Sequence, residues 1–111
     1  MSGLIKNIEF SKIINLKDLV SYEEGQVISR TLAQTPTANI TLFSLDKDEG
    51  ISSHLTPGDA MVQILDGKAE ITIGSNTFTL KEGETIVMPS NIPHALLACE
   101  KFKMLLTVIK G

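Results

Sequence analysis

The sequence predicts an all-β fold built from antiparallel strands. From residue 25 onward, apolar and polar residues tend to alternate with a period of two, as they do in half-buried strands. β-Branched residues are frequent in these segments, and turn-forming residues recur about every 8 to 12 positions. This combination is typical of an antiparallel sandwich or barrel, and it leaves little of the chain for helix.

The first 24 residues show no sustained alternation and differ from the rest of the chain. Asn15 is predicted to cap a short helical turn over residues 16–20, and the polar, glycine-containing stretch 21–25 is predicted to end it. We therefore expect a short N-terminal extension that precedes the strands.

The first strands are predicted at Val27–Ala33 and Ala38–Leu45, with Pro36 between them. A second pair is predicted over residues 61–65 and 68–73. Asp66-Gly67 lies between these two segments, and Asp-Gly is a preferred two-residue hairpin turn because both of its positions need a positive φ. In residues 68–73 apolar and polar side chains alternate, which indicates one buried face and one wet face.

The remaining strands are each introduced by a turn. Residues 74–76 are predicted to turn the chain into a strand at 77–80, and residues 81–83 to turn it into another at 85–88. A loop at 89–93 leads to a short strand at 94–98, and residues 101–108 are predicted as the final strand. No repeat or linker interrupts this order, so residues 1–111 are predicted to form a single domain.

The composition excludes several classes of function. Hydrophobic residues make up 42% of the chain and charged residues 21%, which is typical of a soluble globular protein and argues against disorder. A net charge of −3, dispersed lysines and one arginine argue against a nucleic-acid surface. No apolar run approaches the roughly 18 residues that cross a bilayer, and no secretory pattern opens the chain. We expect a cytoplasmic location, without nucleic-acid or membrane partners.

The single cysteine fits a reducing compartment and excludes an internal disulfide. Cys99 ends the apolar stretch 95–98, so buried packing is favoured over a nucleophilic role. The alternative is a catalytic pair of Cys99 with His94.

Two histidines, 40 residues apart, are the most informative side chains of the sequence. His54 lies in a first pattern, which in its full form runs Gly, five residues, His-x-His, three or four residues, Glu, six residues, Gly. Here Thr56 replaces the second His, Ala60 occupies the Glu position and Gly67 matches the last glycine. The opening glycine is offset, because Gly50 precedes His54 by three intervening residues.

His94 lies in a second pattern, which runs Gly, five residues, Pro-x-Gly, two residues, His, three residues, Asn. Gly83, Pro89 and His94 match at the right spacing, Asn91 stands for the second glycine, and Ala98 stands for the final Asn. Asn substitutes readily for Gly where a left-handed backbone is required. With fifteen residues between the two patterns, the chain resembles the cupin superfamily.

The resemblance spans about residues 38–108 and implies an antiparallel jelly-roll β-barrel, preceded by an N-terminal extension and strands in residues 1–37. Small cupins usually dimerise, so the resemblance also implies a homodimer. Residues 1 to about 36 then offer strands that cross to a partner barrel.

Cupins commonly bind a divalent metal through three histidines and a glutamate. Of that set this chain retains His54 and His94, since Thr56 and Ala60 stand at the other two positions. Asp59 is the candidate third ligand, provided that a bulge or a bend after Pro57-Gly58 turns it inward. The metal predicted on this basis is a single Fe, Mn, Ni, Zn or Cu ion, and the alternative is a polar pocket without metal.

Gln63 and Arg30 are further pocket candidates, because each is a polar residue among apolar strand neighbours. Either could hydrogen-bond a ligand at the barrel mouth, or face solvent on the outer side of its strand. The sequence thus predicts a small cupin barrel that binds a small molecule with a depleted metal-ligand set, or a metal-free ligand-binding or sensor barrel. The resemblance includes enzymes and proteins without catalysis, so it assigns no reaction.

Overall fold

Antiparallel strands form nearly all of the regular structure in the computed structural model. It describes residues 4–54 and 57–111, with residue 54 described by its backbone. No helix within these residues is long and apolar enough to cross a membrane. The elements are η1 (Leu16–Leu19), β1 (Val27–Gln34), β2 (Ala38–Leu45), β3 (Gly50–His54), β4 (Asp59–Ile73), β5 (Asn76–Lys81), β6 (Thr85–Met88), β7 (His94–Leu97) and β8 (Phe102–Ile109).

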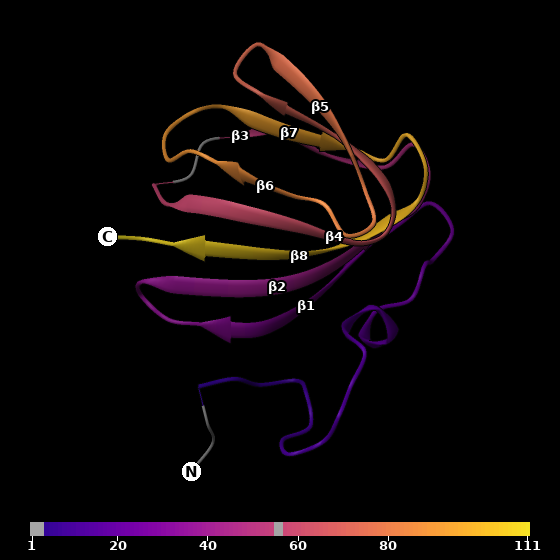
Figure 1. Ribbon diagram of the computed structural model, residues 1–111, viewed down its shortest axis with the longest axis vertical. Coiled ribbons are helices and arrows are strands. Elements are labelled where there is room, and N and C mark those ends of the chain that lie inside the picture. The colour runs from indigo at the N-terminus through magenta and orange to yellow at the C-terminus, as the bar shows by residue number, and fades with distance from the viewer. Residues whose placement is uncertain (1–3, 55–56) are drawn as a thin grey trace.

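The strands curl into two facing layers that share β4. The sheet runs in the order β1-β2-β8-β4-β7-β3, and β5 and β6 also pair with β4. The first half of β4 pairs with β8 and β6 in one layer, and the second half pairs with β5 and β7 in the other. Figure 1 shows β4 curving at one end of the barrel to join these layers. The predicted antiparallel jelly-roll barrel is confirmed.

The Asp66-Gly67 hairpin predicted from the sequence is wrong. Residues 59–73 form one continuous strand of 15 residues, and the register of β4 against β8 shifts between Ile64 and Asp66. Gly67 does take a positive φ of 78°, but Asp66 does not, and a type I′ turn needs both. The glycine therefore bends one strand from layer to layer instead of reversing the chain.

The other predicted strands are observed, to within one residue at each end. β3 was missed, because its residues Ile51, Ser52 and Ser53 do not alternate. The short helical turn is present as η1, but it ends at Leu19, and the Asn15 side chain makes no capping hydrogen bond. The hairpin between β4 and β5 uses Gly74-Ser75, within the turn that was predicted.

The barrel interior is filled by apolar side chains from both layers. The alternation predicted for β4 is observed, since Ala69 and Ile71 are fully buried while Lys68 is exposed. The first half of the strand buries every second side chain in the same way. Together these residues form the inner core, which comprises Leu45, Ala60, Val62, Ile64, Ala69, Ile71, Leu80, Met88, Leu96, Ala98, Phe102 and Met104.

A second, smaller core lies on the outer face of the β1-β2-β8-β4 layer. The N-terminal segment, residues 4–20, runs alongside β1 (Figure 1), and side chains from it pack against this core. Backbone contacts hold it there, because Ile5 bridges to Ala33 and Lys6 N–H donates to the Leu32 carbonyl at 2.7 Å. This outer core comprises Val20, Leu32 and Leu42, with Ile8, Leu16, Leu19, Ile40, Leu65 and Leu105 packed against them.

Tyr22 fastens the end of the N-terminal segment to the bend in β4. Its hydroxyl donates a 2.6 Å hydrogen bond to Asp66 Oδ2, next to Gly67. The ammonium groups of Lys101 and Lys103 lie 4.8 and 5.0 Å from the centre of its ring, within the range of cation–π attraction. Burial, together with the hydrogen bond and the charge of Asp66, raises the pKa of Tyr22 well above its usual range.

Cys99, which was expected to be buried, is only partly buried. Its Sγ lies 3.7 Å from the Lys68 carbonyl oxygen.

Gly67→Ala is expected to destabilise the protein by roughly 4 kcal/mol. An added Cβ would overlap the Lys101 carbonyl oxygen and lie 2.9 Å from Phe102 Cα, in addition to the strain of the positive φ. Gly83→Ala is the matched control, because Gly83 has φ 88° and nothing within 4 Å of its Cβ position. Urea unfolding should show that Gly83→Ala lowers the free energy of unfolding by only about 1–2 kcal/mol. Equal decreases for both variants would contradict the close approach at Gly67.

Tyr22 is expected to resist ionisation in the folded chain. Because its pKa is raised by folding, the stabilisation from this group is complete below the ordinary tyrosine pKa of about 10, and it is lost as the pH rises through the higher folded value. Tyr22 is the single tyrosine and the chain has no tryptophan, so near-ultraviolet absorbance reports it directly. In Asp66→Asn, the pH at which the Tyr22 hydroxyl ionises should fall toward its value in the unfolded chain. An unchanged ionisation pH would contradict the role of Asp66.

Candidate functional site

The two histidines are brought together by the pairing of β3 with β7. Gly50 pairs with Leu97 and Ile51 with Leu96, and the register then shifts by one residue so that His54 lies opposite His94. The extra residue in β3 is a bulge, and without it Ser53 would take the place opposite His94. The predicted juxtaposition of residues 54 and 94 is therefore present in the backbone.

His94 belongs to the interior of the barrel. It is 3% exposed, and it lies two residues before the inner-core residue Leu96, on the same face of β7. Its Nδ1 is 3.3 Å from the Ile92 carbonyl oxygen. A carbonyl only accepts, so this contact requires a hydrogen on Nδ1, and in a neutral ring Nε2 is then the acceptor.

The loop before His94 is held by two local features. Asn91 has φ 62°, which confirms the prediction that it replaces glycine at a left-handed position. The Ser90 backbone N–H donates a 2.9 Å hydrogen bond to Asp59 Oδ1, so the loop is tied to the first residue of β4. His94 therefore begins its strand from an anchored position.

Asp59 does not join the histidines in the interior. It is exposed, and it pairs with Ile109 in regular register, with the buried Ala60 next along the strand. The inward bulge that would bring its carboxylate to a metal is not present at this position. Ala60 supplies a buried methyl group where the family pattern has Glu, and Thr56 lies outside the described residues.

Gln63 and Arg30 lie on the outer face of the sheet. Gln63 sits between Val62 and Ile64, which point into the inner core, so its own side chain points the other way. Arg30 lies on the face of β1 that the N-terminal segment covers, and its Nη1 donates to the Asn7 carbonyl at 3.1 Å. The structure thus brings neither residue to His94.

The side chains at this end of the barrel include too few metal ligands to complete a metal centre. Metal sites of this kind use three or four protein ligands, and among the side chains that the structure describes, those of residues 4–53 and 57–111, no group of three His, Cys, Asp or Glu suited to a metal occurs. Two imidazoles alone do not fit the family's metal, because Ala60 has no donor atom and Asp59 is bonded to Ser90.

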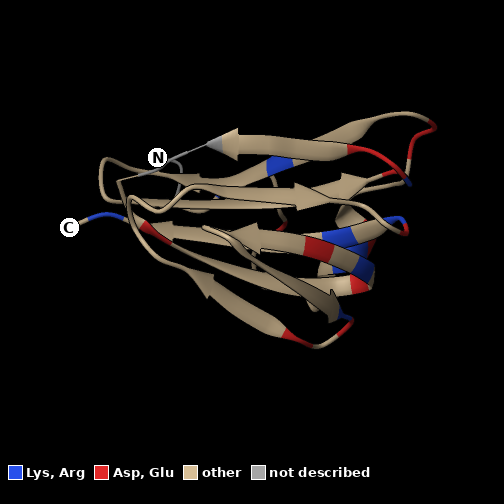
Figure 2. Ribbon diagram, turned by 90° about the horizontal axis from the view of Figure 1, so that it is seen from above, with Lys and Arg blue, Asp and Glu red and all other residues tan. Residues whose placement is uncertain are grey.

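Charged residues avoid the end of the barrel where His94 lies. Figure 2 shows most Lys, Asp and Glu positions gathered at the end opposite the C-terminus. The turns at 46–49, 81–84 and 99–101 carry these charges, whereas the loops 35–37 and 89–93 carry none. Asp59 and Lys110 lie near this end, whereas the loops around it are uncharged.

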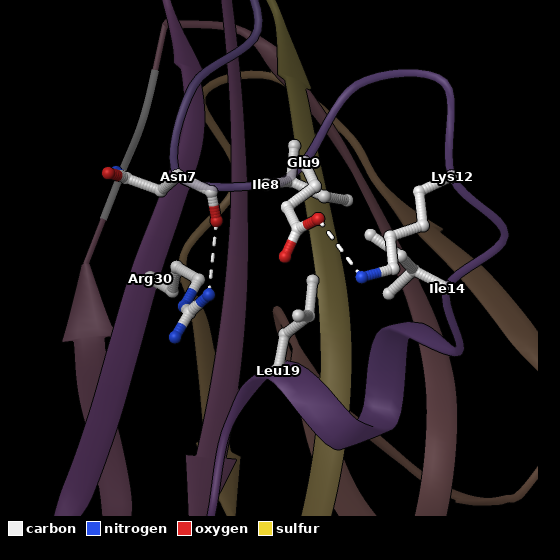
Figure 3. Close-up of a pocket in the computed structure, with 7 residues that line it drawn as sticks. All are labelled: Asn7, Ile8, Glu9, Lys12, Ile14, Leu19 and Arg30. Atoms are coloured by element: carbon white, nitrogen blue, oxygen red, sulfur yellow. Dashed lines mark hydrogen bonds and ion pairs between the residues drawn. The ribbon is translucent and has the colours of Figure 1, made fainter.

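A separate hollow, which the sequence did not reveal, lies between the N-terminal segment and β1 (Figure 3). Its volume is about 500 Å³. It forms outside the barrel because residues 7–14 arch over the outer face of the sheet. Among its residues, Arg30 alone was singled out from the sequence, since the first 24 residues have no periodic pattern that would place the others. The lining comprises Asn7, Ile8, Glu9, Lys12, Ile14, Leu19 and Arg30.

The fold and the buried imidazole define the class of protein: a small jelly-roll barrel with a histidine inside one end. The family model of the Cupin domain matches residues 41–110. The chain belongs to the cupin family.

Solved structures agree with this assignment. A conserved protein of unknown function from Streptococcus pyogenes is 53% identical, with 99% of this chain and 96% of that chain covered and a TM-score of 0.97. A cupin superfamily protein from Desulfitobacterium hafniense is 31% identical, with 96% and 98% covered and a TM-score of 0.92.

A cupin 2 conserved barrel domain protein from Leptotrichia buccalis is 42% identical over 87% of this chain, with a TM-score of 0.86. This chain spans 47% of that protein's length. A comparison with curated proteins finds no match.

Proposed function

We propose that this cupin binds a small molecule at the His94 end of its barrel. The observation that carries the proposal is the register that sets His54 opposite His94, whose side chain is buried. An imidazole is a polar group in an otherwise apolar interior, and a side chain of this kind can orient a bound molecule by hydrogen bonding.

The surroundings favour a ligand that is uncharged or weakly polar. Of the three buried polar side chains in the described parts of the chain, Ser44 donates to the Ser21 carbonyl and Thr41 to Asn39. His94 is therefore the titratable group of the interior, and the loop beside it carries no charge. Met88 and Leu96 supply apolar surface on the neighbouring strands. In this reading His94 orients the ligand and the core excludes water from it.

The alternative proposal is a weak divalent metal site at the same place. The Cα pairing of His54 with His94 favours it, because imidazole is a good ligand for Zn, Cu, Fe and Ni. A third ligand would then come from solvent or from the bound molecule. The missing carboxylate is the reason why we rank the metal-free barrel first.

His94→Phe is the variant that tests the small-molecule proposal. Phenylalanine keeps a planar ring in the interior and removes both nitrogens, so any ligand bonded to His94 should bind about tenfold or more weakly. Ligands are found by native mass spectrometry of the untagged protein and by the rise in Tm during a metabolite screen. Asp59→Asn is the control, since its side chain is exposed and outside the interior, and the amide oxygen of Asn can still accept the Ser90 N–H, so it should retain full affinity.

Elemental analysis of the same samples for Fe, Mn, Ni, Zn and Cu separates the two versions. Near-stoichiometric metal that disappears in His94→Phe and persists in Asp59→Asn would overturn the metal-free proposal in favour of the alternative. Two results would contradict both the small-molecule proposal and the metal alternative. One is a ligand that binds wild type and His94→Phe equally, and the other is a broad screen that finds no ligand dependent on His94.

We also propose that the chain forms a homodimer in the cytoplasm. The support is the N-terminal segment, where Leu4, Ile5, Phe10 and Ile13 expose large apolar side chains on one short stretch. Exposed apolar side chains gathered in this way mark contact surfaces, and a small barrel gains buried area by pairing.

Sedimentation equilibrium at micromolar concentration should give the mass of a dimer. The double substitution Leu4→Asp with Phe10→Asp should shift the protein to a monomer, because a buried carboxylate at an apolar contact is unfavourable. Val87→Asp is the control on exposed surface of β6, and it should leave the dimer intact. A wild-type monomer at that concentration would contradict the proposal.

A further inference from the structure

The hollow between the N-terminal segment and β1 has the features of a second ligand site, outside the barrel. Its residues come from three elements: the loop of residues 7–14, η1 through Leu19, and β1 through Arg30 (Figure 3). Its volume of about 500 Å³ is within the range of sites that enclose small molecules. It lies on the opposite side of the sheet from His94, so it is independent of the barrel interior.

On the β1 side of the hollow, the N-terminal segment is held to the strand by two hydrogen bonds. Asn7 has φ 61°, which turns its carbonyl toward Arg30 Nη1 at 3.1 Å. The Asn7 side-chain Nδ2 donates to the Thr31 carbonyl at 2.7 Å, so the same residue is attached to the strand twice. These contacts hold the loop at a defined distance from the sheet and fix the guanidinium at the edge of the hollow.

Arg30, the single arginine of the chain, carries the charge of the site. It is half-buried, and none of the ion pairs found in the described segments includes it. Glu9, the carboxylate of the lining, is paired with Lys12 at 3.1 Å instead. The lining therefore has two cations and one carboxylate, a net charge of +1 in a chain of net charge −3. A guanidinium with donors beyond Nη1 suits a carboxylate, which takes two parallel N–H donors.

The remaining side chains that carry the argument are apolar, and two of them are packed against the sheet. Ile8 and Leu19 pack against the outer core, and Ile14 lies on the far side of the hollow from Arg30 (Figure 3). A ligand with a charged head at Arg30 would place its body across these three side chains. We propose that the hollow binds a small organic acid, with its carboxylate on Arg30 and an aliphatic body against Ile8, Ile14 and Leu19.

Octanoate is the probe for this proposal, followed by isothermal titration and by backbone amide shifts in NMR spectra of the full chain. The wild type is expected to bind it saturably, with shifts in residues 7–19 and around Arg30. Arg30→Gln should weaken binding about tenfold or more, because it removes the charge-assisted pair. Lys47→Gln removes the same charge at an exposed loop position and should change the affinity less than twofold. Octanol, which lacks the carboxylate, should bind at least tenfold more weakly than octanoate.

A second pair of variants tests the site without changing Arg30. Ile14→Glu puts a carboxylate into the lining, and it should abolish octanoate binding by repulsion and by loss of apolar surface. Val87→Glu makes the same charge change on exposed β6 and should leave binding intact. His94→Phe should also bind octanoate normally, so failure of the barrel proposal does not affect this one.

Three results would overturn the proposal: equal affinity of wild type and Arg30→Gln, equal affinity for octanol and octanoate, or shifts that map to His94 and residues 89–93. Absence of saturable octanoate binding by the wild type would also overturn it. Should Arg30→Gln fail to fold, the Ile14→Glu and Val87→Glu pair decides the outcome.

Discussion

The bend of β4 at Gly67 is the constraint on which the rest of the structure depends. Because one strand belongs to both layers, its first half sets the interior face of the β1-β2-β8 layer, and its second half sets that of the β5-β7-β3 layer. The main chain of residues 101 and 102 approaches so closely there that a side chain at 67 has no room. A strand that continued straight would leave both apolar faces open to water.

The same bend joins the barrel to its N-terminal segment. Asp66 accepts the Tyr22 hydroxyl, and Lys103, its partner on β8, lies against the Tyr22 ring and donates to the Lys17 carbonyl at 2.6 Å. A displacement of β4 at this point would therefore also release the end of the segment that covers the outer core. The inner core and the outer core are in this sense coupled through one short stretch of strand.

Two chemically different regions result from this arrangement. The interior holds a buried imidazole beside uncharged loops, whereas the hollow under the N-terminal segment combines an arginine with aliphatic side chains. The two regions lie on opposite faces of one sheet, so neighbouring positions along a strand point their side chains into different regions. Asp59 and Arg30 illustrate this: strand alternation keeps the carboxylate of Asp59 away from His94 and places Arg30 outside the barrel.

The sequence by itself determined most strand positions, the left-handed site at Asn91 and the cupin family, because alternation, turn residues and motif spacing are local features of a chain. It identified His94 as a site residue for the same reason. Tertiary structure alone decided that Asp66-Gly67 bends a strand instead of closing a hairpin, since the contact that requires it comes from residues 101 and 102. It also decided the bulge that sets His54 opposite His94, and the hollow at Arg30. These features depend on pairings between segments far apart in the chain, whose register no local pattern records.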